Sequence, residues 1–140
     1  MVFGSKKQKA STRIDSLIGV EAKIQGNIMF AGGLRVDGEI VGDVSANDDK
    51  QSTLVVSEKA KISGSIQVGH LVLNGMVEGP IHATQYLELQ SKCKVVGDVF
   101  YATLEMHPGA IVDGKLIHLN GANGAAATMI DPPKPAADNL

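Results

Sequence analysis

The stretch VEGPIHATQYLEL, residues 77–89, sets Gly79 between two branched aliphatic residues, Val77 and Ile81, and then continues into two leucines. Apolar residues at every second position are typical of a β-strand with one buried face. Proline lacks the N–H group that a β-ladder uses, so Gly79 and Pro80 predict a corner between two short strands. We expect Gly79 to occupy an inward position, where its missing side chain lets the backbone turn close to the core axis.

This corner is one of a series. The pattern apolar-x-Gly-x-apolar occurs six times, as IQGNI (24–28), IVGDV (40–44), ISGSI (62–66), VEGPI (77–81), VVGDV (95–99) and VDGKL (112–116). Successive glycines are 16, 22, 15, 18 and 17 residues apart, and the longest interval contains the polar segment NDDKQS (47–52), which we interpret as an inserted loop. Apolar pairs recur with the same period at Leu34/Val36, Leu54/Val56, Leu71/Leu73, Leu87/Leu89 and Leu104/Met106, and Leu17 is expected to begin the first copy.

A period near 17 residues is too short for a strand followed by a full helix, and the body of the chain shows no 3.6-residue periodicity. Stacked units of short strands and bends form a parallel β-solenoid. The sequence therefore predicts an all-β protein with a single β-helix domain over residues 14–120, made of about six coils. Stacked coils lie about 4.8 Å apart, so six coils form a rod of roughly 29 Å. The central inward column is expected to contain Ile28, Val44, Ile66, Ile81, Val99 and Leu116.

Small residues lie four positions before four of the glycines, at Ala22, Ala60, Cys93 and Ala110. The only cysteine thus shares a column with alanines, which predicts a buried small side chain and not a reactive thiol. In the other two copies the bend is shorter and contains its own glycine, Gly38 or Gly75. A single cysteine also excludes an intramolecular disulfide and a zinc site built from cysteines.

Charge divides the chain into three parts. Residues 1–13 carry four basic residues and no acid, the body (14–120) has eight basic and thirteen acidic residues, and residues 121–140 have one basic and two acidic residues. A basic arm on an acidic body argues against nucleic acid as a partner of the body and favours an anionic partner for the arm. The basic start is not followed by an apolar segment, so no signal peptide is expected and a cytoplasmic location is predicted.

The chemistry-bearing residues do not predict an enzyme. Four histidines, His70, His82, His107 and His118, have no i, i+4 partner and no convergent carboxylate spacing, so neither a metal site nor a catalytic site is expected.

Three acids lie beside the glycines, but a glycosidase needs two carboxylates about 5 to 9.5 Å apart in a cleft, and Asp43 and Asp98 are three coils apart. The six-residue repeat of left-handed β-helical acyltransferases does not fit the period either. No phosphate-binding loop of the form G-x-x-x-x-G-K-[ST] is present, so neither nucleotide nor any other cofactor is expected.

Residues 14–120 resemble the bactofilins, bacterial cytoskeletal proteins that form filaments without nucleotide. The resemblance is carried by the six glycine-centred copies, by GGLRVDGEIVGDV (32–44), and by the order of basic head, body and proline-containing tail; the start MVFGSKK (1–7) is similar to the membrane-targeting head of many members. It implies a right-handed, triangular β-helix.

Neither flank of the solenoid looks like a cap. The segment SKKQKAST (5–12) is polar, and the tail at 121–140 contains three prolines after a Gly/Ala-rich stretch, so both flanks are expected to be disordered. Solenoids without caps expose an apolar core and strand edges, which favours end-to-end assembly. Phe100, which falls on an outward column with Met29, is expected to add an exposed aromatic ring near the C-terminal end. The other predicted contacts are Ile14, Leu17 and Ile18 at one end, and Leu116, Ile117 and Leu119 at the other.

The function expected from these features is a nucleotide-independent, filament-forming scaffold at the cytoplasmic face of the inner membrane, which by resemblance positions cell-shape or cell-wall machinery. Its partners would be further copies of itself, an anionic membrane surface, and cell-wall enzymes or other scaffold proteins. The alternative is a monomeric solenoid that holds a protein partner on its polar faces. The residues expected to contact the membrane are Met1, Val2, Phe3, Lys6, Lys7 and Lys9.

Overall fold

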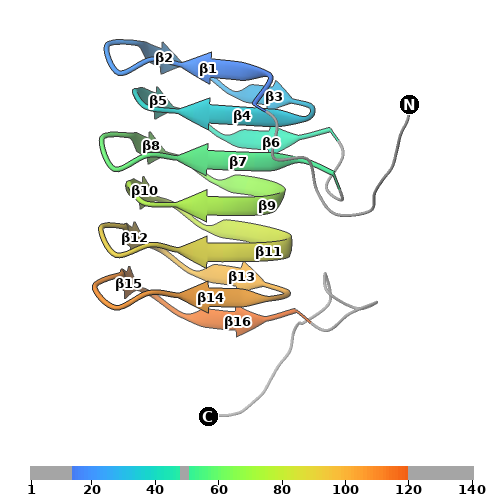
Figure 1. The fold of residues 1–140 in the computed structure, drawn as a ribbon, viewed down its shortest axis with the longest axis vertical. Helices are drawn as coiled ribbons and strands as arrows, with labels where there is room; N and C mark the ends of the chain where they lie inside the picture. The colour runs from blue at the N-terminus through green and yellow to red at the C-terminus, as the bar shows by residue number, and fades with distance from the viewer. Residues whose placement is uncertain (1–13, 48–50, 120–140) are drawn as a thin grey trace.

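A computed structural model of the chain describes residues 14–47 and 51–119. These residues form sixteen short strands and no helix, in coils that stack one on another along the long axis of the molecule (Figure 1). All strand pairs are parallel, which confirms the predicted all-β solenoid of about six coils. None of the described residues belongs to a helix long and apolar enough to cross a bilayer. The predicted basic arm (1–13) and tail (121–140) lie outside the described residues.

Each coil contributes one strand segment to each of three faces. Face 1 contains β1 (Ser16–Ile18), β4 (Gly33–Val36), β7 (Thr53–Val56), residues 70–73 of β9 (Ile66–Leu73), residues 86–89 of β11 (Ile81–Leu89), and β14 (Leu104–Met106). Face 2 contains β2 (Lys23–Gln25), β5 (Glu39–Val41), β8 (Lys61–Ser63), β10 (Met76–Glu78), β12 (Lys94–Val96) and β15 (Ile111–Asp113). Face 3 contains β3 (Ile28–Phe30), β6 (Val44–Ala46), the first parts of β9 and β11, β13 (Val99–Tyr101) and β16 (Leu116–His118).

The register confirms the predicted inward columns. Ile28 pairs with Val44, Val44 with Ile66, Ile66 with Ile81, Ile81 with Val99, and Val99 with Leu116. The members in the middle of the stack are fully buried, so each coil places its aliphatic side chains directly on those of the next coil. The first coil corrects one prediction: Leu17 pairs with Arg35 and points outward, while Ile18 pairs with Val36 and takes the inward position.

The corner glycines are needed because glycine stacks on glycine. Gly79 has a φ of 150°, and a Cβ on it would lie 2.2 Å from the carbonyl oxygen of Gly64 in the preceding coil. Such a Cβ points along the stack and not toward the core axis, which corrects the expected role of Gly79. The Gly79 N–H still donates to the Val96 carbonyl at 2.9 Å, so the ladder continues through the corner.

The residue after each corner glycine is where proline is tolerated. In three coils the N–H of this residue donates to a side-chain oxygen of the preceding coil: Asp43 to Asn27 Oδ1 at 3.0 Å, Ser65 to Asp43 Oδ1 at 2.9 Å, and Lys115 to Asp98 Oδ1 at 3.1 Å. Backbone carbonyls do not supply these acceptors. Pro80 therefore removes a side-chain contact and leaves the backbone ladder intact.

The long and short bends fit together. Cys93 and Ala60 are buried at the ends of long bends, as the alanine column predicts, and burial raises the pKa of the Cys93 thiol. A Cβ on Gly75, in a short bend, would lie 2.3 Å from the Ser57 carbonyl oxygen of the long bend before it. A Cβ on Gly38 would meet the Gly19 carbonyl in the same way. Each short bend therefore packs beneath the carbonyls of a long one.

The inserted segment is shorter than predicted. Residues 48–50 lie outside the described residues, but Ser52 is fully buried and its Oγ accepts the Gly69 N–H at 2.9 Å. Its carbonyl also accepts the His70 N–H at 3.0 Å. Ser52 therefore belongs to the coil, because it satisfies the backbone of the next corner, and the expected loop boundary at residue 52 is wrong.

Candidate assembly surfaces

Both ends of the solenoid expose strand edges. Within residues 14–47 and 51–119, the first-coil strands β1, β2 and β3 each pair with one neighbour, and so do the last-coil strands β14, β15 and β16. An unpaired edge presents a row of backbone donors and acceptors that another chain can join. In Figure 1 these strands lie at opposite ends of the stack.

The N-terminal end combines this edge with apolar side chains. Leu17 is 61% exposed and Val20 57%, and Ile14 is also exposed. Ile18 is only partly buried and packs against the core. The structure thus brings the predicted residues Ile14, Leu17 and Ile18 to one end, and it adds Val20, which the sequence reasoning missed because Val20 lies in a bend outside the repeated pattern.

The C-terminal end is similar but differs from the prediction in two residues. Leu116 is 42% exposed and Ile117 is half-buried, whereas Leu119 is only 7% exposed and so offers little surface for a contact. Ile111, 54% exposed, was missed. The sequence contained a signal for Ile111, because the same outward column has Lys94 one coil earlier, and an aliphatic residue takes the place of this charged one in the last coil.

Phe100 is part of the side of the rod and not of its end. The register places it in the outward column of Met29 and Ile117, as predicted. Its ring is half-buried and stacks on the His82 imidazole with centroids 4.3 Å apart and planes 3° from parallel, so the expected exposed aromatic is wrong. One ring face is covered by the histidine of the preceding coil.

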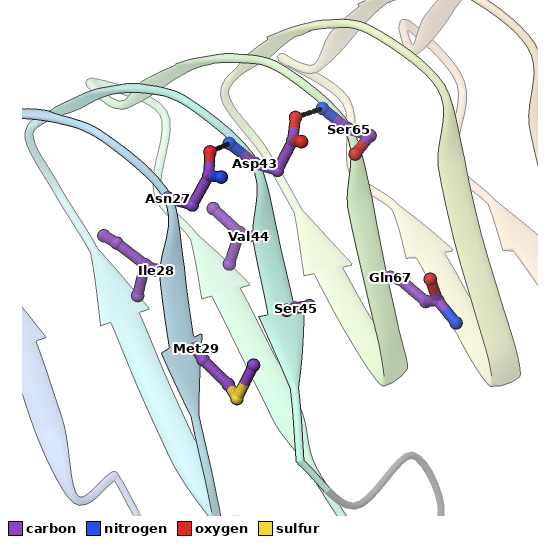
Figure 2. A pocket seen from close by; sticks show the side chains of 8 residues that line it. All are labelled: Asn27, Ile28, Met29, Asp43, Val44, Ser45, Ser65 and Gln67. Atoms are coloured by element: carbon purple, nitrogen blue, oxygen red, sulfur yellow. Dashed lines mark hydrogen bonds between the residues drawn. The ribbon is translucent and has the colours of Figure 1, made fainter.

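An open hollow of about 450 Å³ lies where Asn27, Asp43 and Ser65 follow one another along a corner (Figure 2). Figure 2 shows the two hydrogen bonds that link these residues, with the Asp43 carboxylate turned toward the Ser65 amide. Of the eight residues that line this hollow, Asp43 alone is acidic. It therefore lacks the pair of carboxylates that glycoside hydrolysis requires.

His107 meets two carboxylates, which corrects the expectation that no histidine has a convergent carboxylate. Its Nε2 lies 3.1 Å from Glu88 Oε2 and 3.2 Å from Glu105 Oε2. Glu88 and Glu105 pair across β11 and β14, so they share an outward column of face 1. The i, i+4 spacing of a helix does not predict this cluster, because the coil period brings together residues 17 and 19 positions apart.

Tyr86 and Gln90 flank this cluster. The Tyr86 hydroxyl donates a hydrogen bond to Glu105, and this bond, burial and the charges of Glu105 and Glu88 raise the pKa of Tyr86 to about 12. Gln90 Nε2 donates to Glu88 Oε2 at 3.1 Å. The two carboxylates are thus held in place by neutral donors.

These features define a class of protein: a three-faced parallel β-solenoid whose two ends, within the described part of the chain, carry unpaired edges and exposed apolar side chains. The chain belongs to the bactofilin family, described as polymer-forming cytoskeletal, whose pattern matches residues 16–117. It is 26% identical over 113 residues to the bactofilin BacP of Myxococcus xanthus strain DK1622, a match that covers 80% of this chain and 45% of BacP. It is 24% identical over 110 residues to BacO of the same strain, covering 79% of this chain and 84% of BacO. No solved structure matches the chain.

Proposed function

We propose that this polymer-forming cytoskeletal protein assembles end to end, without nucleotide, into filaments at the cytoplasmic face of the inner membrane. There the filaments would position cell-shape or cell-wall machinery, with cell-wall enzymes or other scaffold proteins as partners. No catalytic role is proposed, because Asp43 and Asp98 accept backbone N–H groups of the next coil and the hollow beside Asp43 has no second carboxylate.

The observation that carries end-to-end assembly is the exposed apolar surface at both open ends. Leu17 and Val20 lie at one end, and Leu116 and Ile111 lie at the other. Burial of one such side chain is worth about 1.5 to 3 kcal/mol, and a filament repeats each contact at every junction. The backbone edges of the first and last coils can also pair, because stacked coils continue a parallel ladder.

The membrane part of the proposal rests on the basic arm, which lies outside the described residues. Phe3 can insert into the bilayer interface, and each lysine near an anionic leaflet adds about 1 kcal/mol. One arm therefore binds weakly. A filament presents many arms at once, so its apparent affinity can rise about 100-fold or more through avidity.

A second candidate is a monomeric solenoid that holds a protein partner. The hollow beside Asn27, Asp43 and Ser65 favours it, because this surface combines polar groups with the exposed side chain of Met29. Electron microscopy of the full-length protein at physiological salt without nucleotide separates the two. Filaments are expected, whereas monodisperse particles at every protein concentration tested would favour the monomeric module.

A further inference from the structure

The geometry points to a divalent transition-metal site formed by Glu88, Glu105 and His107, with zinc as the best-fitting ion. The three ligand atoms, one oxygen from each carboxylate and Nε2 of the imidazole, all lie within 4.8 Å of one another. Imidazole and carboxylate together are a ligand set that zinc accepts, commonly as three protein ligands with water in the remaining position.

The distances from His107 Nε2 to the two carboxylates suit a single ion. Zinc binds nitrogen and carboxylate oxygen at about 2.0 to 2.2 Å, so two atoms on one ion are about 2.9 Å apart in octahedral geometry and about 3.4 Å apart in tetrahedral geometry. The two distances from His107 Nε2, 3.1 and 3.2 Å, lie between these values. An ion can therefore replace the present contacts with small side-chain rotations.

The charge also favours a cation. Glu88 and Glu105 stand directly opposite each other in adjacent coils, where two carboxylates repel. Among the residues that the structure describes, the ion pairs of lysine and arginine are Arg35–Asp37 and Lys61–Glu78, and both are remote from this cluster. A neutral imidazole can donate only one N–H at Nε2, so it satisfies one carboxylate well, whereas a divalent ion can bind both.

The surrounding donors hold the carboxylates in a binding orientation. Tyr86 donates to the second oxygen of Glu105, Oε1, and leaves Oε2 facing His107. Gln90 Nε2 donates to Glu88 Oε2, the same oxygen that faces His107, which leaves one lone pair of this oxygen for the ion. Such outer contacts orient metal ligands, and their loss usually weakens metal affinity about 10- to 100-fold.

The position of the site gives it a consequence for assembly. Glu88 lies on β11 in the fifth coil, whereas Glu105 and His107 lie on or beside the edge strand β14 in the last coil. Within the described residues β14 pairs only with β11, so an ion at this point would attach the last coil to the coil before it. Zinc would thereby stabilise the end that, under the proposed function, meets the next subunit; metal binding itself does not depend on that proposal.

The test is a titration of the full-length protein with zinc chloride, followed by isothermal calorimetry in a non-chelating buffer at pH 7.5. One ion per chain is expected. His107→Ala and Glu105→Gln should each weaken binding at least tenfold, with far-ultraviolet circular dichroism unchanged. The matched control is His118→Ala, which removes the other histidine of the last coil and should leave the affinity within twofold.

Cobalt(II) provides an independent readout, because its visible spectrum reports coordination by nitrogen and oxygen. A spectrum that appears with the wild type and with His118→Ala, but not with His107→Ala, supports the site. Absence of saturable one-to-one binding, or equal affinity in wild type and His107→Ala, would overturn the proposal whether or not the protein forms filaments.

Discussion

Asp43 accepts the Ser65 amide through its Oδ1 at 2.9 Å, although the two residues are 22 positions apart in the sequence. The contact exists because the coils place each corner directly on the previous one. Polar side chains at these corners thus replace the backbone acceptors that the turn of the chain removes. The corners are therefore where single substitutions should act most sharply.

The first prediction concerns the corner glycine Gly79. Gly79→Ala should lower the free energy of unfolding by more than about 4 kcal/mol, because its Cβ would lie 2.2 Å from the Gly64 carbonyl and φ is 150°. Gly26→Ala has a positive φ but meets nothing within 4 Å, so backbone strain alone should cost about 1 to 3 kcal/mol. Gly19→Ala has neither defect and should be close to neutral. Thermal unfolding followed by circular dichroism tests this order, and equal effects of the three variants would contradict it.

The second prediction concerns Ser52. Ser52→Ala removes a buried hydroxyl and leaves the Gly69 N–H without its acceptor, so stability should fall by about 1 to 3 kcal/mol. Ser45→Ala is the matched control, since Ser45 is half-buried in an outward column and should change stability by less than about 0.5 kcal/mol. Urea unfolding measures both. If Ser52→Ala does not change the free energy of unfolding, residue 52 belongs to the inserted loop.

The third prediction concerns the ends. Leu17→Arg and Leu116→Arg should leave the coils folded but raise the protein concentration needed for filaments about 10- to 100-fold, because each variant replaces an apolar contact at every junction. Val96→Arg is the control: Val96 is 39% exposed, close to the 42% of Leu116, but it lies on the side of the rod. Pelleting and electron microscopy across a concentration series measure the threshold. The end contact is refuted if all three variants assemble as the wild type does.

The fourth prediction concerns pH. Burial lowers the pKa of His82 from its ordinary value of 6.5, so the unfolded chain binds the proton more readily than the folded chain. The stability that depends on neutral His82 is therefore present above pH 6.5 and is lost as pH falls through the folded pKa. His82→Gln, which copies the Gln67 of the same column, should lose less stability than the wild type between pH 8 and pH 5. If the free energies of unfolding of the two proteins change with pH at the same rate, burial of His82 does not contribute to the pH dependence of stability.

The fifth prediction concerns the arm. Full-length protein should pellet with anionic vesicles, and less so at high salt. Deletion of residues 1–9 should abolish vesicle pelleting while filaments persist. Neutral vesicles serve as the control. If the truncated protein pellets as well as the intact one, the anchor lies elsewhere in the chain.

The repeat alone was enough to predict the coil number and most of the register, because every copy places a glycine between two aliphatic residues. The repeat gave the wrong inward residue in the first coil, because Leu17 and Ile18 are both apolar and adjacent. Only their stacking on Arg35 and Val36 decides that Ile18 faces inward.

The side-chain clusters were harder to predict. His107 and Glu88 meet only because adjacent coils align. They are 19 residues apart in the sequence, a separation that neither helix nor hairpin geometry would bring into contact. Phe100 is less exposed than predicted because His82 of the preceding coil covers one face of its ring, and Leu119 is only 7% exposed. Pairing the outward columns by the coil period would have found both the His107 cluster and the stack on Phe100.

The packing of short bends beneath long ones makes the coils unequal as building blocks. Two long bends stack directly in the last two coils, where a Cβ on Gly109 would lie 2.7 Å from the Ser91 carbonyl oxygen. A duplicated short-bend coil, in contrast, would have no long-bend carbonyls above its glycine, so a chain of this type can lengthen by whole coils with long bends or by pairs of one long-bend and one short-bend coil. The length of the subunit, and with it the spacing of anything attached to each copy along a filament, would then change in fixed increments, in the manner of a molecular ruler.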